Sequence, residues 1–174
     1  MKYLVKFFVV TFFLIVSTHA FAEQKIVVLD MKYVLNNSKA GRDAQEYLKE
    51  KFNNNAKKFS ELENSLKKEE TDLLVAKVSL TKEEYTKKSD VLRKKVIDYQ
   101  SQRRSSIDKL TTQRLEARKI LMKQIEPILD AYIKKNSISI VIDKKNMLGG
   151  LTEYDITKII VEKLDKEFPS LNLQ

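Results

Sequence analysis

The chain has 174 residues, a formal net charge of +9, no cysteine, no tryptophan and a single histidine. Without cysteine it cannot form a disulfide, a Cys/His zinc site or a cysteine nucleophile. The one histidine, His19, lies in an apolar leader, so imidazole acid–base catalysis is not expected of the remainder.

The first 22 residues have the pattern of a secretory signal peptide. Two lysines precede a largely apolar block at 7–16, and Ala20-Phe21-Ala22 supplies the small residues of a cleavage site. We therefore expect cleavage between Ala22 and Glu23 and export of the rest of the chain. The alternative is an uncleaved membrane anchor, because residues 3–22 just reach the roughly 20 residues that a spanning helix needs.

A short strand and a helix start follow the leader. Residues 25–30 form a β-branched run that ends in Asp, which predicts a buried strand. Asp30 can cap a brief helical turn, which Asn36-Asn37 ends. Ser38 is a good N-cap for the next helix, and Gly41 lies in its first turn.

Residues 42–136 contain no glycine and only one proline, and their apolar residues recur at helical spacing. This is far longer than the roughly 8–20 residues of an ordinary globular helix, so a helical hairpin or coiled coil is predicted. Thr81 and Glu84 have the spacing of a capping box, which marks a new helix start. We place the tip of the hairpin at 78–81 and the arm at 42–119.

Both halves of this run have heptad spacing, but the pattern is imperfect. In the first half one heptad position is apolar throughout, and Asn55 and Glu69 interrupt the other. In the second half Arg103 and Ser106 interrupt the pattern. The apolar positions are Phe52, Phe59, Leu66 and Leu73, then Tyr85, Leu92 and Tyr99.

The positive charge is concentrated on the second half of the arm. Between Lys87 and Lys123 there are 12 basic and 4 acidic residues. Such a surface attracts acidic partners: nucleic acid, anionic lipid or acidic polypeptide. The alternative is an ordinary solvated helix face.

A small body closes the chain. The apolar face widens from Ile120, and Pro127 is expected to kink or restart the helix. Residues 138–143 predict a second strand, and Gly149-Gly150 a break. Asp155 or Thr152 is expected to cap a last helix that ends before Pro169. The apolar face of that helix carries Ile156, Ile159, Ile160, Leu164 and Phe168.

The fold class predicted is α+β, mostly α, with a long antiparallel coiled-coil arm on a β-containing body made of 23–41 and 120–174. Two or three strands and one helix leave open sheet edges and too small a core for independent stability. We therefore expect this body to be an oligomerisation base that associates with copies of itself.

The order of these elements resembles the Skp/OmpH family of periplasmic chaperones. The resemblance covers the whole chain after the leader. It is carried by residues 26–41, by Leu80-Thr81-Lys82-Glu83-Glu84 at the tip, by residues 138–143, and by Tyr154-Asp155-Ile156-Thr157 before the last helix. None of these is a catalytic motif, and no enzyme activity is expected.

The resemblance implies a jellyfish-like homotrimer in the periplasm, with three helical hairpins around a cavity. It further implies that the cavity holds unfolded outer-membrane β-barrel proteins, keeps them from aggregating and passes them to the outer-membrane assembly machinery. No ATP or other cofactor is implied. Lipopolysaccharide is a further partner that the resemblance suggests, beside the anionic lipid that the charge of the arm suggests.

On this hypothesis, exposed basic side chains of the arm attract the client. The candidates are Lys87, Lys88, Arg93, Lys94, Lys95, Arg103, Arg104, Arg114 and Arg118. Phe52, Phe59, Tyr85 and Tyr99 could add apolar contacts, but their heptad positions favour a place in the core of the arm.

Three other classes of function remain open at this point. A basic hairpin could bind nucleic acid, but the export signal and the lack of interleaved aromatics disfavour this. A structural adaptor of the cell envelope fits the broken heptads less well. An enzyme is disfavoured because no carboxylates form a recognisable constellation.

Overall fold

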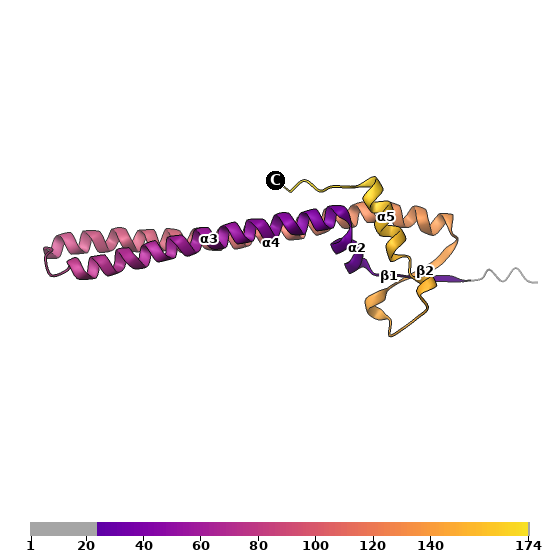
Figure 1. The fold of residues 1–174 in the computed structure, drawn as a ribbon, viewed down its shortest axis with the longest axis horizontal. Helices are drawn as coiled ribbons and strands as arrows, with labels where there is room; N and C mark the ends of the chain where they lie inside the picture. The colour runs from indigo at the N-terminus through magenta and orange to yellow at the C-terminus, as the bar shows by residue number, and fades with distance from the viewer. Residues whose placement is uncertain (1–23, 174) are drawn as a thin grey trace, which may run out of the picture.

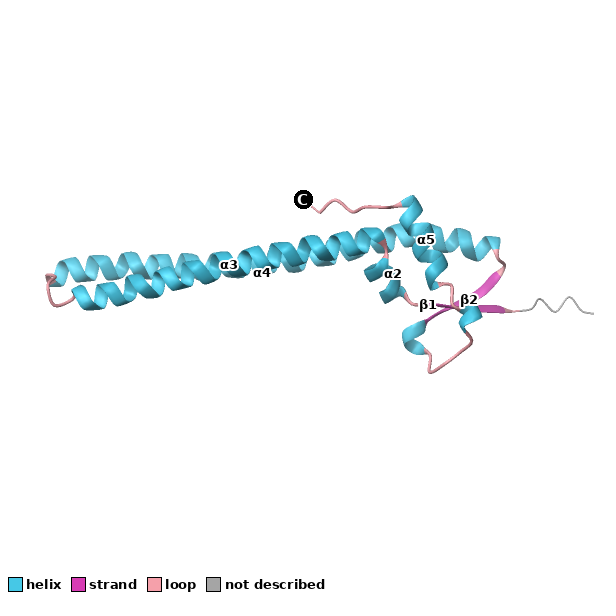
Figure 2. Ribbon diagram, viewed as in Figure 1, coloured by secondary structure: helices cyan, strands magenta, loops and turns pink. Residues whose placement is uncertain are grey.

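A long helical arm projects from a small body that contains the strands (Figure 1). The computed structural model describes residues 24–173, so the predicted signal peptide and its cleavage site lie outside the described residues. Figure 2 shows both strands at the body end of the described residues. In chain order the main elements are β1 (Lys25–Leu29), α2 (Met31–Asn37), α3 (Lys39–Ala76), α4 (Lys82–Lys135), β2 (Ile138–Asp143) and α5 (Thr157–Glu167).

The two predicted strands are confirmed, and they pair in parallel. Parallel strands need a crossover connection, and here the crossover is the entire helical arm. On its other edge β1 is joined by a short bridge, in which the Ile156 N–H donates to the Val28 carbonyl at 2.9 Å. The far edge of β2 has no strand partner among residues 24–173.

The junction between body and arm depends on three small or polar residues, as the sequence predicts. Asp30 accepts from the Tyr33 N–H at 2.7 Å and caps α2. Ser38 is fully buried and accepts from the Gly41 N–H at the start of α3. A Cβ on Gly41 would lie 2.1 Å from the Leu35 carbonyl oxygen, so only glycine lets α2 and α3 approach this closely.

The helical hairpin is confirmed, with its turn between Ala76 and Lys82. The 38 residues of α3 span about 57 Å at 1.5 Å per residue. The predicted capping box forms in both directions: the Thr81 N–H donates to the Glu84 carboxylate at 2.9 Å, and the Glu84 N–H donates to the Thr81 hydroxyl at 3.3 Å.

Pro127 does not restart the helix, because α4 runs through it to Lys135. The proline is exposed, so the backbone carbonyl that loses its donor can be hydrated. Its neighbours Ile125 and Ile128 are buried in the body, with 1% and 5% of their surface exposed. Packing of this apolar face therefore outweighs the missing hydrogen bond.

The start of the last helix differs slightly from the prediction. Thr152 lies in a short 3-10 turn, Thr152–Tyr154, and does not cap α5. Asp155 accepts from the Thr157 N–H at 2.9 Å, one position before the assigned helix boundary. Ile156, Ile160 and Leu164 are buried as expected, whereas Ile159 is 37% exposed.

The hydrophobic core lies where α2, the end of α4, α5 and the sheet meet. It includes Val27, Val34, Leu121, Ile125, Ile160 and Leu164. Asp165 links α5 to the arm, because its carboxylate accepts from the Lys39 N–H at 2.6 Å at the start of α3. The arm is thus anchored to the body by packing and by a cap from a distant helix. No helix within residues 24–173 is long and apolar enough to cross a membrane.

Candidate binding surface of the helical arm

The two arm helices meet along the predicted seam, but the packing is shallow. The rings of Phe59 and Tyr99 make an edge-to-face contact with centroids 6.0 Å apart. Phe59 is buried, whereas Leu66, Leu73, Leu92 and Val96 are only half-buried. Two helices alone cannot enclose their seam, so apolar side chains of the arm remain accessible along its length.

Two polar contacts join the helices across the seam. The Tyr99 hydroxyl donates to Glu63 at 3.2 Å, and the Lys95 ammonium donates to Glu69 at 2.6 Å. Glu69, which interrupts the heptad pattern, therefore has a partner on the opposite helix. The hydrogen bond from Lys67, followed by that from Tyr99, holds the pKa of the Glu63 carboxyl below its ordinary value.

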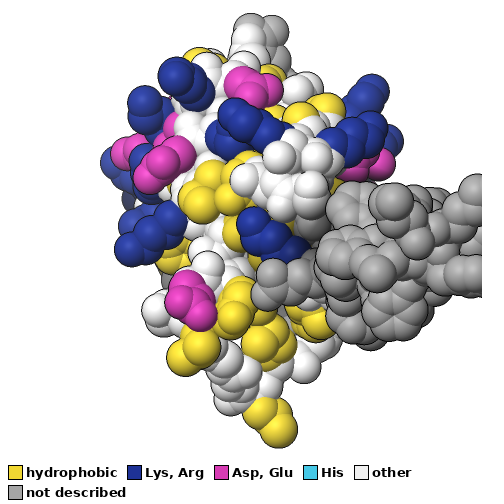
Figure 3. All heavy atoms as spheres, turned by 90° about the vertical axis from the view of Figure 1, so that its right-hand side faces the viewer, with side chains coloured by type: hydrophobic (Ala, Val, Ile, Leu, Met, Phe, Trp, Pro, Cys, Tyr) yellow, Lys and Arg dark blue, Asp and Glu magenta, His cyan; other side chains and the backbone are white. Residues whose placement is uncertain are grey.

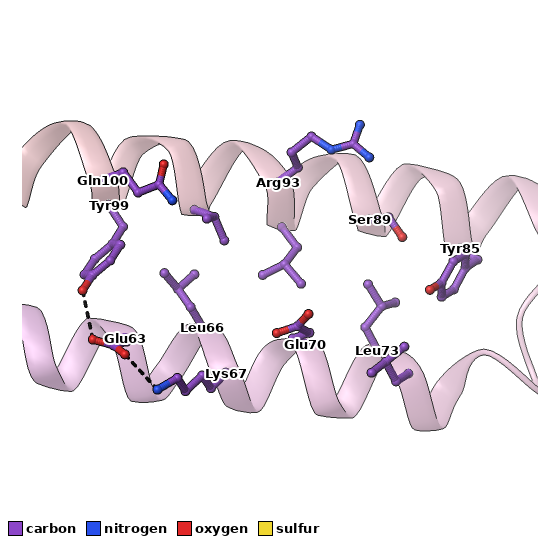
Figure 4. A pocket seen from close by; sticks show the side chains of 13 residues that line it. Glu63, Leu66, Lys67, Glu70, Leu73, Tyr85, Ser89, Arg93, Tyr99 and Gln100 are labelled. Carbon is purple, nitrogen blue, oxygen red and sulfur yellow. Dashed lines mark hydrogen bonds and ion pairs between the residues drawn. The ribbon is translucent and has the colours of Figure 1, made fainter.

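An open groove lies between α3 and α4 in the half of the arm nearer the tip (Figure 4). Its volume is about 470 Å³. Tyr85 and Tyr99 stand at its two ends, and both helices contribute apolar side chains between them. It is lined by Glu63, Leu66, Lys67, Glu70, Leu73 and Leu74 of α3, and by Tyr85, Ser89, Leu92, Arg93, Val96, Tyr99 and Gln100 of α4.

All nine basic residues predicted to attract a client are exposed on α4. They extend from Lys87 to Arg118 and so cover about 46 Å of helix, which makes a surface and not a single site. Two of them form ion pairs: Arg93 with Asp90 at 3.2 Å and Lys95 with Glu69 at 2.6 Å. Their role in client binding stays a prediction.

The aromatic residues of the arm divide into two groups. Phe59 is buried, and Tyr85 and Tyr99 are half-buried in the seam, in agreement with a place in the core of the arm. Phe52 differs, because 60% of its surface is exposed. Phe52 precedes Phe59 by seven residues, about two turns of α3, and so lies nearer the body.

Sequence reasoning missed the groove and the exposed apolar residues away from the heptad seam. Val78 in the turn is 95% exposed, and Val75 is 71% exposed. The sequence feature that could have indicated the groove is Ser89. It occupies a seam position of α4 with a side chain too small to fill the space between the helices.

The body exposes a second apolar surface, on the side that faces away from the arm (Figure 3). Hydrophobic side chains gather there over the part of the body that the figure shows. We call this surface the body face. The name refers to the exposed hydrophobic side chains of the body, Ile26, Ile140, Leu148, Leu151, Tyr154 and Ile159, each at least 37% exposed. Of these, Ile26 and Ile140 are partners across β1 and β2.

No candidate metal-binding site is present in the part of the chain that the structure describes. Residues 24–173 bring together no group of three or more histidine, cysteine, aspartate or glutamate side chains that could hold a metal ion. What these residues do offer is a long basic surface with accessible apolar side chains, suited to many weak contacts.

A two-helix arm with a basic second helix, on a small body that contains a two-stranded parallel sheet, defines the class of protein by its fold. More specifically, the chain belongs to the OmpH-like family, whose model, Outer membrane protein (OmpH-like), matches residues 25–164. This confirms the resemblance seen in the sequence. The family is non-enzymatic, and membership supports a chaperone role.

Two known proteins illustrate the similarity. A Skp-like protein of Pseudomonas aeruginosa is 26% identical over 171 residues, which cover 95% of this chain and 99% of that protein. The crystal structure of an OmpH-like protein from Caulobacter crescentus CB15 matches with a TM-score of 0.79 at 15% identity. That match covers 90% of this chain and 92% of the other, and at this identity it establishes the fold alone.

Proposed function

We propose that this protein is an ATP-independent periplasmic holdase that encloses unfolded outer-membrane β-barrel proteins between helical arms. The observation that carries the proposal is the arm itself, which is basic along α4 and half-open along its seam. Family membership and the chaperone designation of the Caulobacter relative support it. Unfolded β-barrel chains expose alternating apolar strands that pair and aggregate, and they need such a partner.

The body face supports a homotrimer as part of this proposal. An apolar surface beside an unpaired strand edge is unfavourable in a monomer, and association of three copies would cover both. A central body would then hold three arms around a cavity. Sedimentation velocity of the purified protein tests this step: we expect a single species of three times the chain mass, and a monomer at micromolar concentration would contradict it.

A direct assay tests the chaperone function. A β-barrel outer-membrane protein is diluted from urea in the presence of increasing amounts of this protein, and light scattering reports aggregation. We expect suppression to be complete near one trimer per client and to need no nucleotide. Unchanged scattering at that ratio would reject the holdase function.

The export signal completes the proposal. A periplasmic site of action requires that residues 1–22 direct export and are cleaved after Ala22. N-terminal sequencing of protein recovered from the periplasm should begin at Glu23. Retention of the uncleaved chain in the membrane would favour the anchor alternative.

A further inference from the structure

The groove between α3 and α4 has the form of a slot and not of a round pocket. Tyr85 and Tyr99 at its ends are 14 residues apart on α4, or about 21 Å at 1.5 Å per residue. That length matches about six residues of an extended chain at 3.3 Å per residue. A linear apolar occupant therefore fits the slot better than a compact one.

The slot opens on one face of the arm only. Lys95 and Glu69, which pair across the seam at 2.6 Å, do not line it, so this ion pair covers the seam on the opposite face. The Tyr99 hydroxyl bonded to Glu63 closes the end nearer the body. Ser89 leaves room between these boundaries, and the half-buried leucines of both helices form the floor.

The rim of the slot is balanced in charge, unlike the basic surface around it. Two carboxylates, those of Glu63 and Glu70, and two basic groups, those of Lys67 and Arg93, line it. A nucleic acid or an anionic headgroup would meet two carboxylates here and gain no net attraction. Peptide groups, which offer both N–H donors and carbonyl acceptors, find partners of both kinds on this rim.

We propose that this slot is a client-binding site that receives a short apolar stretch of an unfolded polypeptide in extended form. Its side chains pack on the floor formed by Leu66, Leu73, Leu92 and Val96, while its backbone lies between the charged rims. The inference rests on the proposed holdase function and adds a defined site to it. Each arm then carries its own short binding site, and the basic surface of α4 serves to attract the client toward it.

Filling the slot tests the proposal. Ser89→Leu places a larger apolar side chain at a seam position, so it should occupy the slot while leaving every charge and the stability of the arm in place. Ser106→Leu is the matched control, because Ser106 is also a half-buried seam serine of α4 but lies outside the slot. The readout is the dissociation constant for a fluorescently labelled, urea-diluted β-barrel protein.

We expect Ser89→Leu to weaken binding about tenfold, the factor that corresponds to about 1.4 kcal/mol. Ser106→Leu should leave the affinity within twofold of the wild type. Equal affinities of the two variants would overturn the proposal that the slot binds the client. Suppression of aggregation by the wild type is measured in the same series. If the wild type suppresses aggregation and Ser89→Leu binds as tightly as the wild type, the slot is rejected as a binding site and the holdase function is not.

A second measurement needs no change in packing. The chain has no cysteine, so Ser89→Cys introduces a unique thiol in the slot, and Ser65→Cys introduces one on an exposed position of α3 outside it. An excess of the unfolded β-barrel protein should slow maleimide alkylation of the Ser89→Cys variant at least fivefold more than that of the Ser65→Cys variant. Equal protection of both sites, or protection by oleate instead of the polypeptide, would overturn the assignment.

Discussion

At the scale of single residues, close packing at the root of the arm depends on the absence of one side chain. Gly41 is buried where α3 leaves α2, and a Cβ there would lie 2.1 Å from the Leu35 carbonyl oxygen. In most helix positions alanine is favoured over glycine by about 1 kcal/mol. Here the backbone of α2 would have to move instead.

Gly41→Ala should therefore destabilise the protein by about 1–3 kcal/mol, the usual cost of overpacking. Urea unfolding followed by circular dichroism gives the free energy of unfolding. Gly149→Ala is the control, because a Cβ at that glycine has open space around it. Equal unfolding midpoints for the two variants would show that α2 and α3 tolerate a wider separation.

Glu63 links stability to pH. Its pKa is held below the ordinary 4.5, first by the hydrogen bond from Lys67 and then by that from Tyr99. A carboxyl with a lowered folded-state pKa stabilises the fold above its unfolded pKa, and this contribution is lost as pH falls through the lowered value. Glu63→Gln should thus lower the melting temperature at pH 7, and the difference from the wild type should shrink progressively as the pH falls below 4.5. A difference that does not shrink as the pH falls would exclude this linkage.

At the scale of elements, the strands, the hairpin and its turn follow from local signals in the sequence. The Thr81–Glu84 box and the β-branched runs at 25–30 and 138–143 are signals that neighbouring residues carry by themselves. Pro127 and Ile159 were harder to predict, because tertiary packing decides whether a helix continues and which of its side chains are covered. For the slot the sequence carries one signal, the small side chain of Ser89 at a seam position, but the face on which the slot opens depends on which side of the seam the Lys95–Glu69 pair covers.

The cap of α4 is the element-scale feature most open to a test. Thr81→Ala removes the hydroxyl that accepts from the Glu84 N–H, which typically costs about 1 kcal/mol of helix stability. Because the turn lies at the free end of the arm, the loss should be local. Hydrogen exchange should quicken at residues 82–85 while the global melting temperature changes little. Thr111→Ala, in the middle of α4, is the control and should leave exchange at the tip unchanged.

At the scale of the whole molecule, the body and the arm are stabilised in different ways. The body has a small core and an apolar body face beside an open strand edge, so association with other copies would stabilise it. The arm has little core and depends on a seam that is only half-covered. That shallow seam weakens the arm as a folded unit, but it also leaves apolar side chains accessible along about 57 Å, as the proposed client binding requires.

The distribution of charge between these two parts leads to the last prediction. If the basic surface of α4 attracts unfolded clients, its position on the arm should matter and not only the total charge. Replacing Lys87, Lys88, Lys94 and Arg104 with glutamine removes four positive charges from the arm without breaking either ion pair found on α4. The same change at Lys32, Lys134, Lys158 and Lys166, which are exposed on the body end, removes an equal charge elsewhere.

Stopped-flow association with an unfolded β-barrel protein should distinguish the two variants. The arm variant should associate several-fold more slowly at low salt, where screening is weak. Its rate should depend less on ionic strength, because it has fewer charges whose attraction salt can screen. The body variant should keep the rate and the salt dependence of the wild type. If both variants slow equally, net charge alone attracts the client, and the apolar contacts of the seam must then account for the preference of the arm as the binding surface.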